Sequence, residues 1–410
     1  MGSGVRGMRK FFFLTIVFGL SLVSCAKDKP DAVSSATARK GTPPPRVLLN
    51  TIMPDAAADG VVKIAVLVNL MAGENSRQFI EGCVSEGRSL HFTVDAFVSG
   101  AVEQRCREIA CGIASADYDG LIFAWGDVGF SYDILKPIAD KGIPIVTFEA
   151  LPYRDGKSIK GLVTTFQDDY NLARLSVETL LSLVSDNPDG IDRPARIIRV
   201  GTEQGITFLD RRAWAFGEFV GKGRIEEVAL VKLGSLENPR SAAWEALAAV
   251  LPRFPPGTID GLWVPWDEFA NGCAEALASA GRRDIKLTSI GISNDVIHEM
   301  LRHPDIWLAS AAVDPKLAGT VNMRLLAARL AGDPSVTETF SFSPQLVKTT
   351  DLNIGVDLGN ISVIVPGWGE GEGLFDNYKW MIDLKAAGEK YLRVPPVPLS
   401  QTTAASQVMP

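Results

Sequence analysis

From Lys63 onward, short apolar runs rich in β-branched residues alternate with longer stretches of helical period. This alternation predicts parallel strands joined by helices, an α/β architecture, because each pattern fits only one kind of element. The expected strands cover residues 63–68, 92–97, 120–124, 143–148, 161–165, 195–200, 226–232, 261–265, 285–290 and 306–311.

The intervening segments carry apolar residues at helical spacing. Residues 169–184 place leucines on roughly one side, residues 268–280 end at Gly281, and Leu317, Val321 and Leu325 repeat every four residues. Ten strands exceed what one sheet comfortably holds at this length. We therefore expect two sheets of about five strands, one in each of two lobes.

Composition narrows the function. The chain is 46% hydrophobic and 22% charged, with a net charge of −7 and no long basic run after the first residues, which argues against nucleic acid as a partner. It has three histidines and neither an HExxH nor a GxSxG motif. We expect no metal, no cofactor and no enzymatic activity.

Four cysteines lie within the expected lobes: Cys83, Cys106, Cys111 and Cys273. Their spacing matches neither a CxxC pair nor a zinc module. Buried free thiols are the favoured interpretation, and a disulfide stays open.

The two ends of the chain differ from its middle. Residues 26–61 are rich in Lys, Pro, Ala, Ser and Thr, which predicts a flexible tether. Residues 351–410 are expected to form a Gly- and Pro-rich extension packed on the body, with a disordered tail from about 400.

The first residues have the layout of a secretory signal. Arg9 and Lys10 precede an apolar run that stops at Cys25 and is too short to span a bilayer. Leu22-Val23-Ser24-Cys25 resembles the lipobox of bacterial lipoproteins. The resemblance implies removal of residues 1–24, acylation of Cys25 and a protein anchored by lipid on the extracytoplasmic side of a membrane. An ordinary signal with a chance cysteine is the alternative.

Five segments resemble, in order, the sugar-binding proteins of bacterial ABC importers that share the type I periplasmic binding fold. The likeness covers residues 62 to about 345, and the segments are Asp119–Ala124 ("DGLI"), Leu135–Val146 ("A...GIPVV"), Arg212–Phe216 ("RxxGF"), Asp267–Gly272 ("NDxxAxGA") and Ala311–Pro315. The resemblance implies two Rossmann-like lobes joined by a hinge of three crossovers, with a ligand cleft between them. Lobe 1 would comprise residues 62–165 and 315–340, and lobe 2 residues 166–314 and 341–350.

In such folds the ligand binds outside the carboxyl ends of the strands, so polar and aromatic residues that follow strands are the candidates. Charged side chains hydrogen-bond sugar hydroxyls strongly, and aromatic faces cover C–H surface. Arg212 matches the ligand arginine of the resembled family. The predicted ligand residues are Asn69, Asn75, Trp125, Asp127, Glu149, Arg212, Trp266, Asp267, Asn294 and Asp314.

Plain alternatives stay open for several of them. Asp267 and Asp314 precede helices, so either could serve as an N-cap. Trp125 and Trp266 could pack in the core, and Glu149 could pair with Arg212 across a closed cleft. A turn at 185–190 lies where some relatives hold calcium, although a plain turn is the better interpretation.

Two departures from the resembled pattern bear on the ligand. Ile292-Ser293-Asn294 replaces the family's "FDG", which removes or moves a common sugar-contacting aspartate, and Trp266 stands where relatives often carry Asn. These changes argue against ribose or galactose itself and leave a polyol or another small polar ligand open.

The resemblance implies a monomeric, membrane-tethered receptor that captures a sugar or sugar-like solute by lobe closure and delivers it to an ABC permease. The alternative is a sensor or adaptor lipoprotein of the same fold that feeds no transporter.

Overall fold

The computed structural model describes residues 62–70, 73–126, 128–184, 193–203, 206–234, 237–369, 371 and 373–391. The predicted signal, Cys25, the tether, Asp127, the turn at 185–190 and the tail from 400 lie outside the described residues. Within the described ranges, none of the helices combines the length and apolarity needed to span a bilayer.

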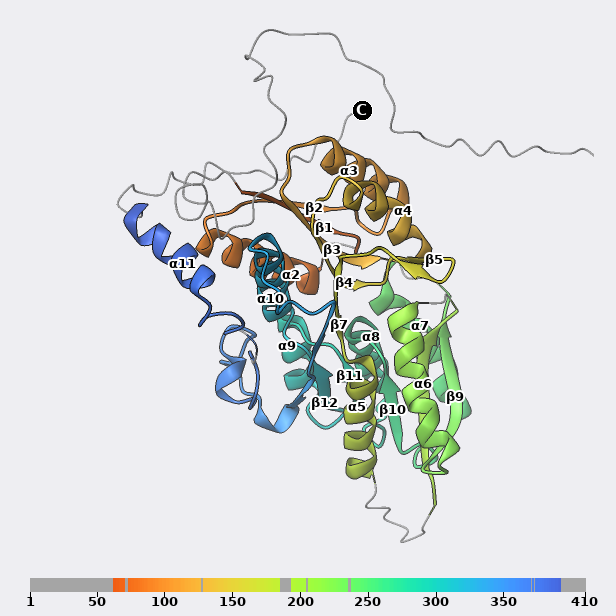
Figure 1. The fold of residues 1–410 in the computed structure, drawn as a ribbon. Helices are drawn as coiled ribbons and strands as arrows, with labels where there is room; N and C mark the ends of the chain where they lie inside the picture. The colour runs from red at the N-terminus through yellow and green to blue at the C-terminus, as the bar shows by residue number, and fades with distance from the viewer. Residues whose placement is uncertain are drawn as a thin grey trace, which may run out of the picture. The chain divides into compact units, whose positions relative to one another are not determined.

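The first sheet has six strands in the order β13-β7-β4-β3-β1-β2 (Figure 1). Every neighbouring pair is parallel, so the carboxyl ends of all six strands lie along one edge. The strands are β1 (Lys63–Val68), β2 (Thr93–Val98), β3 (Gly120–Gly126), β4 (Ile145–Ala150), β7 (Val163–Gln167) and β13 (Thr339–Phe342).

The second sheet also has six strands, in the order β14-β12-β11-β10-β8-β9. All its pairs are parallel except that of β12 with β14, which is antiparallel. The strands are β8 (Ala195–Thr202), β9 (Ile225–Leu233), β10 (Gly261–Val264), β11 (Lys286–Ile290), β12 (Trp307–Ala312) and β14 (Gln345–Lys348).

The predicted α/β class is confirmed, but the expected number of about five strands per sheet is too low. The sixth strands, β13 and β14, lie at the sheet edges and have only four residues each, of which one is buried in each strand, so they lack the apolar run that marks the others. The sequence pattern also did not predict a two-stranded hairpin of β5 (Tyr153–Arg154) and β6 (Lys157–Ser158), because all four of its strand residues are exposed.

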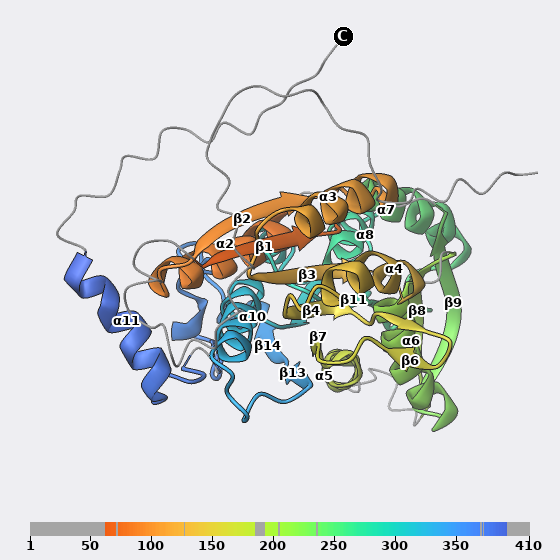
Figure 2. The ribbon, with the colours of Figure 1, turned by 45° about the horizontal axis from the view of Figure 1, so that its top comes forward.

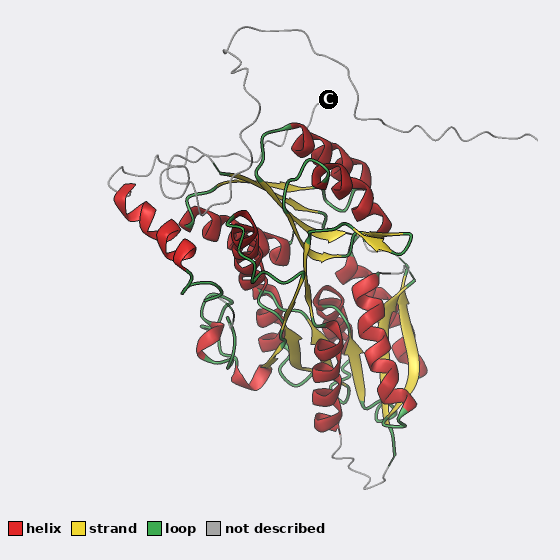
Figure 3. Cartoon of the chain, viewed as in Figure 1, coloured by secondary structure: helices red, strands yellow, loops and turns green. Residues whose placement is uncertain are grey.

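Helices cover both faces of the first sheet (Figure 3). Residues Ile64, Val66 and Val68 of β1 join the core under α2 (Glu74–Ser89) and α10 (Pro315–Leu330), while Ala65 and Leu67 join the core under α3 (Glu103–Ser115) and α4 (Val128–Ala139). Figure 2 shows α3 and α4 over this sheet. Burial of both faces explains why the strands read as continuous apolar runs. We call this sheet with its helices the first lobe.

The second sheet is covered in the same way and forms the second lobe. Ile197 belongs to the core under α5 (Asp169–Val184) and α6 (Thr207–Gly221), whereas Ile198 and Val200 belong to the opposite core. That core includes α7 (Pro239–Val250), α8 (Asp267–Ser279) and α9 (Asn294–Arg302).

Three chain segments connect the lobes. β7 of the first sheet leads into α5, β12 of the second sheet leads into α10, and β13 leads into β14. Helices α10 and α2 lie side by side (Figure 1) and meet backbone to backbone, since a Cβ added to Gly319 would lie 2.0 Å from the Phe79 carbonyl oxygen. Glycine is needed there for this close approach.

The segment beyond residue 350 contributes to both lobes. Leu352, Val356 and Ile361 belong to a core cluster of the second lobe, whereas Met381 and Leu384 of α11 (Lys379–Tyr391) belong to one of the first. Residues 352–384 are therefore part of the folded body rather than a detachable extension. Among the described cysteines, Cys83, Cys106 and Cys273 are buried free thiols, and Cys111 is half-buried.

Candidate ligand-binding site

A cavity lies at the carboxyl ends of the strands of both sheets. Its volume is about 70 Å³. Since one water needs roughly 10–15 Å³ of such volume, the cavity has room for about five waters. The described residues that line it are Leu70, Asn75, Trp125, Phe148, Glu149, Gln167, Phe208, Arg212, Trp266, Asp267, Gly291, Ile292, Val313 and Pro315.

Six of the predicted ligand residues meet in this cavity. Trp125 and Glu149 end β3 and β4, and Trp266 and Asp267 form the start of α8 after β10. The other two come from helices that follow strands: Asn75 from the first turn of α2, and Arg212 from α6.

Two lining residues have backbone conformations that side chains rarely adopt. Trp125 has φ of 57° and Glu149 has φ of 50°, both in the left-handed region. Such conformations are unfavourable for residues other than glycine and cluster at ligand sites, where surrounding contacts hold them. These conformations direct the side chains of Trp125 and Glu149 from the strand ends into the cavity lining.

Glu149 is held by contacts from both lobes. Its Oε1 accepts a hydrogen bond from the Gln167 backbone N–H at 2.5 Å, and its Oε2 pairs with Arg211 Nη2 at 3.0 Å. Burial, followed by repulsion from Asp169, raises the pKa of Glu149 to about 7, against the lowering effects of Gln167, Arg211 and Arg212. The alternative in which Glu149 pairs with Arg212 across the cleft is wrong, because the cation that pairs with Glu149 is Arg211, the residue before Arg212.

Arg212 is fixed in place by two acceptors. Its Nε donates to Asp169 Oδ1 and its Nη1 to the Pro265 carbonyl oxygen, both at 2.7 Å, and its guanidinium lies 4.9 Å from the centre of the Phe208 ring. The side chain is almost fully buried. A guanidinium has five N–H donors, so this anchoring leaves donors for the cavity that it lines.

Asp267 is fully buried and linked to the other lobe. Its Oδ2 accepts from Asn75 Nδ2 at 3.3 Å, and its Oδ1 accepts from the Glu268 backbone N–H at 3.1 Å. Burial, followed by repulsion from Glu268, raises its pKa to about 7. The N-cap of α8 is Trp266, so Asp267 both satisfies a first-turn N–H and lines the cavity.

The two tryptophans pack and line the cavity at once. Trp125 makes edge contacts with Phe79 and Phe148, each with ring centres 5.2 Å apart. Trp266 contacts Phe208 at 6.1 Å and Phe269 at 4.9 Å in the same manner. Both stay half-buried, so part of each indole faces the cavity.

Three predicted ligand residues have other partners and do not line the cavity. Asn69 accepts from the Ser99 hydroxyl at 2.6 Å, and Asn294 accepts from the Leu358 backbone N–H at 2.9 Å. Asp314 is the N-cap of α10, which is the alternative given for it above. Its side-chain Oδ1 accepts a hydrogen bond from the Lys316 backbone N–H at 2.9 Å. We therefore leave all three out of the ligand set, and Asp127 lies outside the described residues.

Sequence reasoning missed the apolar part of the lining and one amide. The signal was present, because most of these residues sit at strand ends or in the first turns of helices. The missed residues are Leu70, Phe148, Gln167, Phe208, Gly291, Ile292, Val313 and Pro315. In the part of the chain that is described, no group of three or more His, Cys, Asp and Glu side chains could hold a metal ion.

Comparison with known proteins identifies relatives of this chain. Residues 64–334 match the model of a periplasmic binding protein domain. The structure of a sugar ABC transporter from Yersinia enterocolitica subsp. enterocolitica 8081 is 32% identical, with a TM-score of 0.70 over 82% of this chain and 98% of its own. None of the curated proteins matches.

More distant structures share the fold. A 5-methylthioribose transporter solute binding protein from Thermotoga lettingae, solved with 5-methylthioribose, is 23% identical, with a TM-score of 0.69 over 81% of this chain and 99% of its own. GanP, a glucose-galactose binding protein from Geobacillus stearothermophilus, is 19% identical, with a TM-score of 0.58 over 72% and 99%.

Proposed function

The chain belongs to the periplasmic binding protein family, and on that premise we propose that it captures one monosaccharide-sized sugar or polyol in the cavity between its lobes. The observation that carries the proposal is the lining itself. Arg212, Glu149 and Asp267 offer charged hydrogen-bonding groups, and Trp125 and Trp266 offer indole faces. Sugars present hydroxyls and C–H surface, which these two kinds of side chain bind.

Lobe closure is the proposed mechanism of capture. The lining draws on both lobes, so a guest reaches all of its contacts only when the lobes are together. A ligand shifts an open–closed equilibrium in proportion to its differential affinity for the two states. The Glu149–Arg211 ion pair and the Asn75–Asp267 hydrogen bond support this proposal, because each joins the two lobes.

Binding is tested by thermal unfolding with a panel of monosaccharides, disaccharides and polyols. A ligand that binds only the folded protein raises Tm by mass action, so we expect a monosaccharide or polyol to raise it and disaccharides, which exceed the cavity, to leave it unchanged. No shift from any compound, together with no retained solute in native mass spectrometry of freshly purified protein, would sink the proposal.

The proposed partner is an ABC permease that accepts the closed, loaded form. Deletion of the gene should abolish uptake of the sugar that raises Tm, and the wild-type gene should restore it. Unchanged uptake in the deletion strain would favour the sensor or adaptor alternative.

Lipid attachment at Cys25 would hold the receptor on the extracytoplasmic side of the membrane. Two acyl chains give lasting attachment where one gives only marginal binding. The test is a Cys25→Ser variant: labelled palmitate should enter the wild type alone, and the mature variant should leave the membrane fraction. Equal labelling of both proteins would rule out Cys25 as the acylated residue.

A further inference from the structure

The cavity lining is more apolar than a fully hydroxylated guest requires. Among the described residues, five polar side chains other than the two tryptophans line it: Asn75, Glu149, Gln167, Arg212 and Asp267. The aromatic side chains of the lining suit the C–H faces of a sugar ring. Aliphatic side chains are a different matter, because they provide neither a π-face nor a hydrogen-bonding group.

The polar groups of the lining are linked to one another through contacts between the lobes. Arg211 bridges Glu149 and Asp169, and Asp169 binds Arg212. Asp267 pairs with Asn75 and is close enough to Arg212 for that charge to lower its pKa. These contacts join the polar groups into one network.

Four aliphatic residues form what we call the aliphatic wall: Leu70, Ile292, Val313 and Pro315. They follow β1, β11 and β12 or begin α10. Gly291 donates its backbone N–H to the Ala311 carbonyl oxygen at 2.9 Å, which places Ile292 and Val313 after neighbouring strand ends. Leu70 packs against the core cluster that contains Val313. The four residues therefore enter the lining from strand ends of both lobes and from the start of α10.

A hydroxyl pressed against this wall would lose its bonds to water without gaining others. Such an unpaired buried group weakens binding by roughly tenfold or more. A methyl or another alkyl group in the same place would gain by leaving water. The wall therefore discriminates between sugars that differ in one hydroxyl.

We infer that the guest is a monosaccharide with one apolar end, a deoxy or alkyl-substituted sugar whose hydroxyl edge binds Arg212, Glu149 and Asp267 and whose apolar end contacts the aliphatic wall. This inference rests on the proposed function, since it takes the cavity to be a sugar site. It adds the class of sugar that the site selects.

Calorimetric titration of matched pairs tests the inference: D-ribose with 5-deoxy-D-ribose, D-galactose with D-fucose, and D-glucose with 6-deoxy-D-glucose. Each pair differs by one hydroxyl. We expect the deoxy member of at least one pair to bind at least about tenfold more tightly than its parent. If parents bind as tightly as or more tightly than their deoxy partners, the inference is overturned while the proposed function stands. If none of the six binds while another fully hydroxylated monosaccharide or a polyol raises Tm, the inference is overturned and the proposed function stands. If no compound of that wider panel raises Tm and no solute is retained, both are contradicted.

A substitution in the wall provides an independent readout. Val313→Thr keeps the shape and adds a hydroxyl, so it should reduce the preference for the deoxy member by about fivefold. The matched control is Val146→Thr, which makes the same change at a buried position of β4 that does not line the cavity. It should leave the ratio of the two affinities unchanged. If Val313→Thr leaves the ratio of the two affinities unchanged, the aliphatic wall does not contact the position at which the two sugars differ, and the inference is contradicted.

Discussion

Arg211 of the second lobe lies with its Nη2 3.0 Å from Oε2 of Glu149 in the first lobe. The same guanidinium donates through Nε to Asp169 Oδ2 at 2.8 Å. Asp169 also accepts a hydrogen bond from Arg212, the proposed sugar-binding arginine. The Glu149–Arg211 ion pair between the lobes is therefore connected to the position of Arg212 through Asp169. The side chain of Glu149 is buried, so its charge depends on these partners.

Replacement of Arg211 by Gln should loosen the closed form. The variant leaves the Glu149 carboxylate without the cation that binds it, which makes closure less favourable. We expect about tenfold weaker binding of whichever sugar raises Tm in the wild type, or about 1.4 kcal/mol. Calorimetric titration measures the affinity, and X-ray scattering of the sugar-free protein should give a larger radius of gyration.

Arg174→Gln is the matched control, because Arg174 pairs with Glu178 along the exposed side of α5. An exposed pair of this kind contributes about 0–1 kcal/mol, so affinity and radius should match the wild type. Equal affinity in the Arg211 and Arg174 variants would contradict a role of the interlobe ion pair in closure.

Asp267→Asn should alter the pH dependence of stability. The pKa of Asp267 is raised from 3.8 to about 7 in the folded protein, so the folded state keeps a proton that the unfolded chain releases. Its contribution to stability is present below about pH 4 and is lost as pH rises to about 7. Asn stays neutral throughout. Relative to the wild type, the free energy of unfolding of the variant should rise by about 2–4 kcal/mol between pH 4 and pH 8.

Urea unfolding at a series of pH values measures this difference. A constant difference between Asp267→Asn and the wild type across the range would show that Asp267 is ionised in the folded protein throughout.

Trp266→Ala should weaken sugar binding, because the indole covers C–H surface that water would otherwise contact. The expected loss is about tenfold to a hundredfold in affinity. Tryptophan fluorescence and calorimetry both report it. Trp214→Ala serves as control, since Trp214 is 65% exposed on α6 and does not line the cavity. A comparable loss of sugar affinity in both variants would show that the loss does not arise from the contact of Trp266 with the sugar in the cavity.

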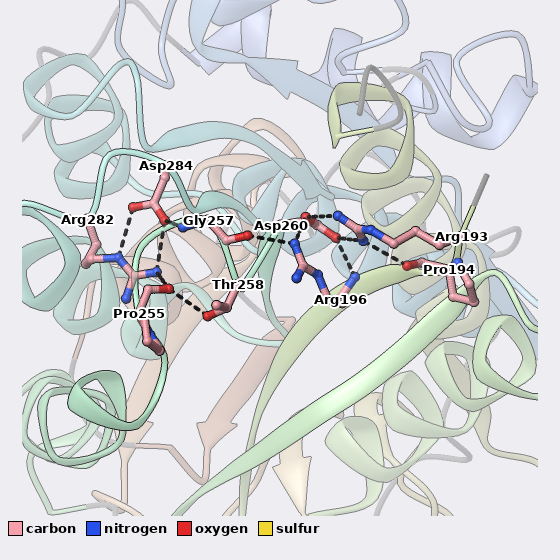
Figure 4. Close-up of polar contacts among 9 residues, drawn as sticks. All are labelled: Arg193, Pro194, Arg196, Pro255, Gly257, Thr258, Asp260, Arg282 and Asp284. Carbon is pink, nitrogen blue, oxygen red and sulfur yellow. Dashed lines mark hydrogen bonds and ion pairs between the residues drawn. The ribbon is translucent and has the colours of Figure 1, made fainter. Parts of the chain in front are cut away.

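Asp260→Asn should destabilise the second lobe without changing sugar affinity. Asp260 binds Arg193 and Arg196 at the amino end of β10, opposite the cavity (Figure 4). Burial raises its pKa, but hydrogen bonds from the two arginines outweigh burial and lower it to about 2. A depressed pKa stabilises the fold above about pH 4, and this contribution is lost as pH falls towards 2. We expect a loss of about 1–2 kcal/mol at pH 7.

Urea unfolding at pH 7 and pH 3 checks this prediction. The loss should be smaller at pH 3, because there the Asp260 carboxyl of the unfolded chain, with a pKa of 3.8, is mostly protonated while that of the folded protein stays ionised. An equal loss at both pH values would contradict the ion-pair explanation. A change in sugar affinity would contradict the separation of this cluster from the cavity.

Most strands were predictable because both faces of each sheet are buried. β1 reads as an unbroken apolar run for that reason. Strand β13 was not predictable, since its pairing with β7 depends on where the chain returns after α10 and not on its own four residues.

The site was predictable where a strand end fixes the side chain, as with Trp125 and Glu149. It was not predictable where a distant segment decides. Asn294 follows β11 as expected, but its side-chain oxygen Oδ1 accepts a hydrogen bond from the backbone N–H of Leu358, which is 64 residues away in sequence. The role of Arg211 was not predictable, because Arg211 and Arg212 are neighbours in sequence. Only the contact between the two lobes shows that Arg211 pairs with Glu149, whereas Arg212 pairs with Asp169.

The most direct measurement of the central claim is a crystal structure with the sugar that gives the largest rise in Tm. Our account predicts one guest between Trp125 and Trp266, with hydroxyls within hydrogen-bond distance of Arg212 and Glu149. A guest bound elsewhere on the chain, with only water between these residues, would contradict it.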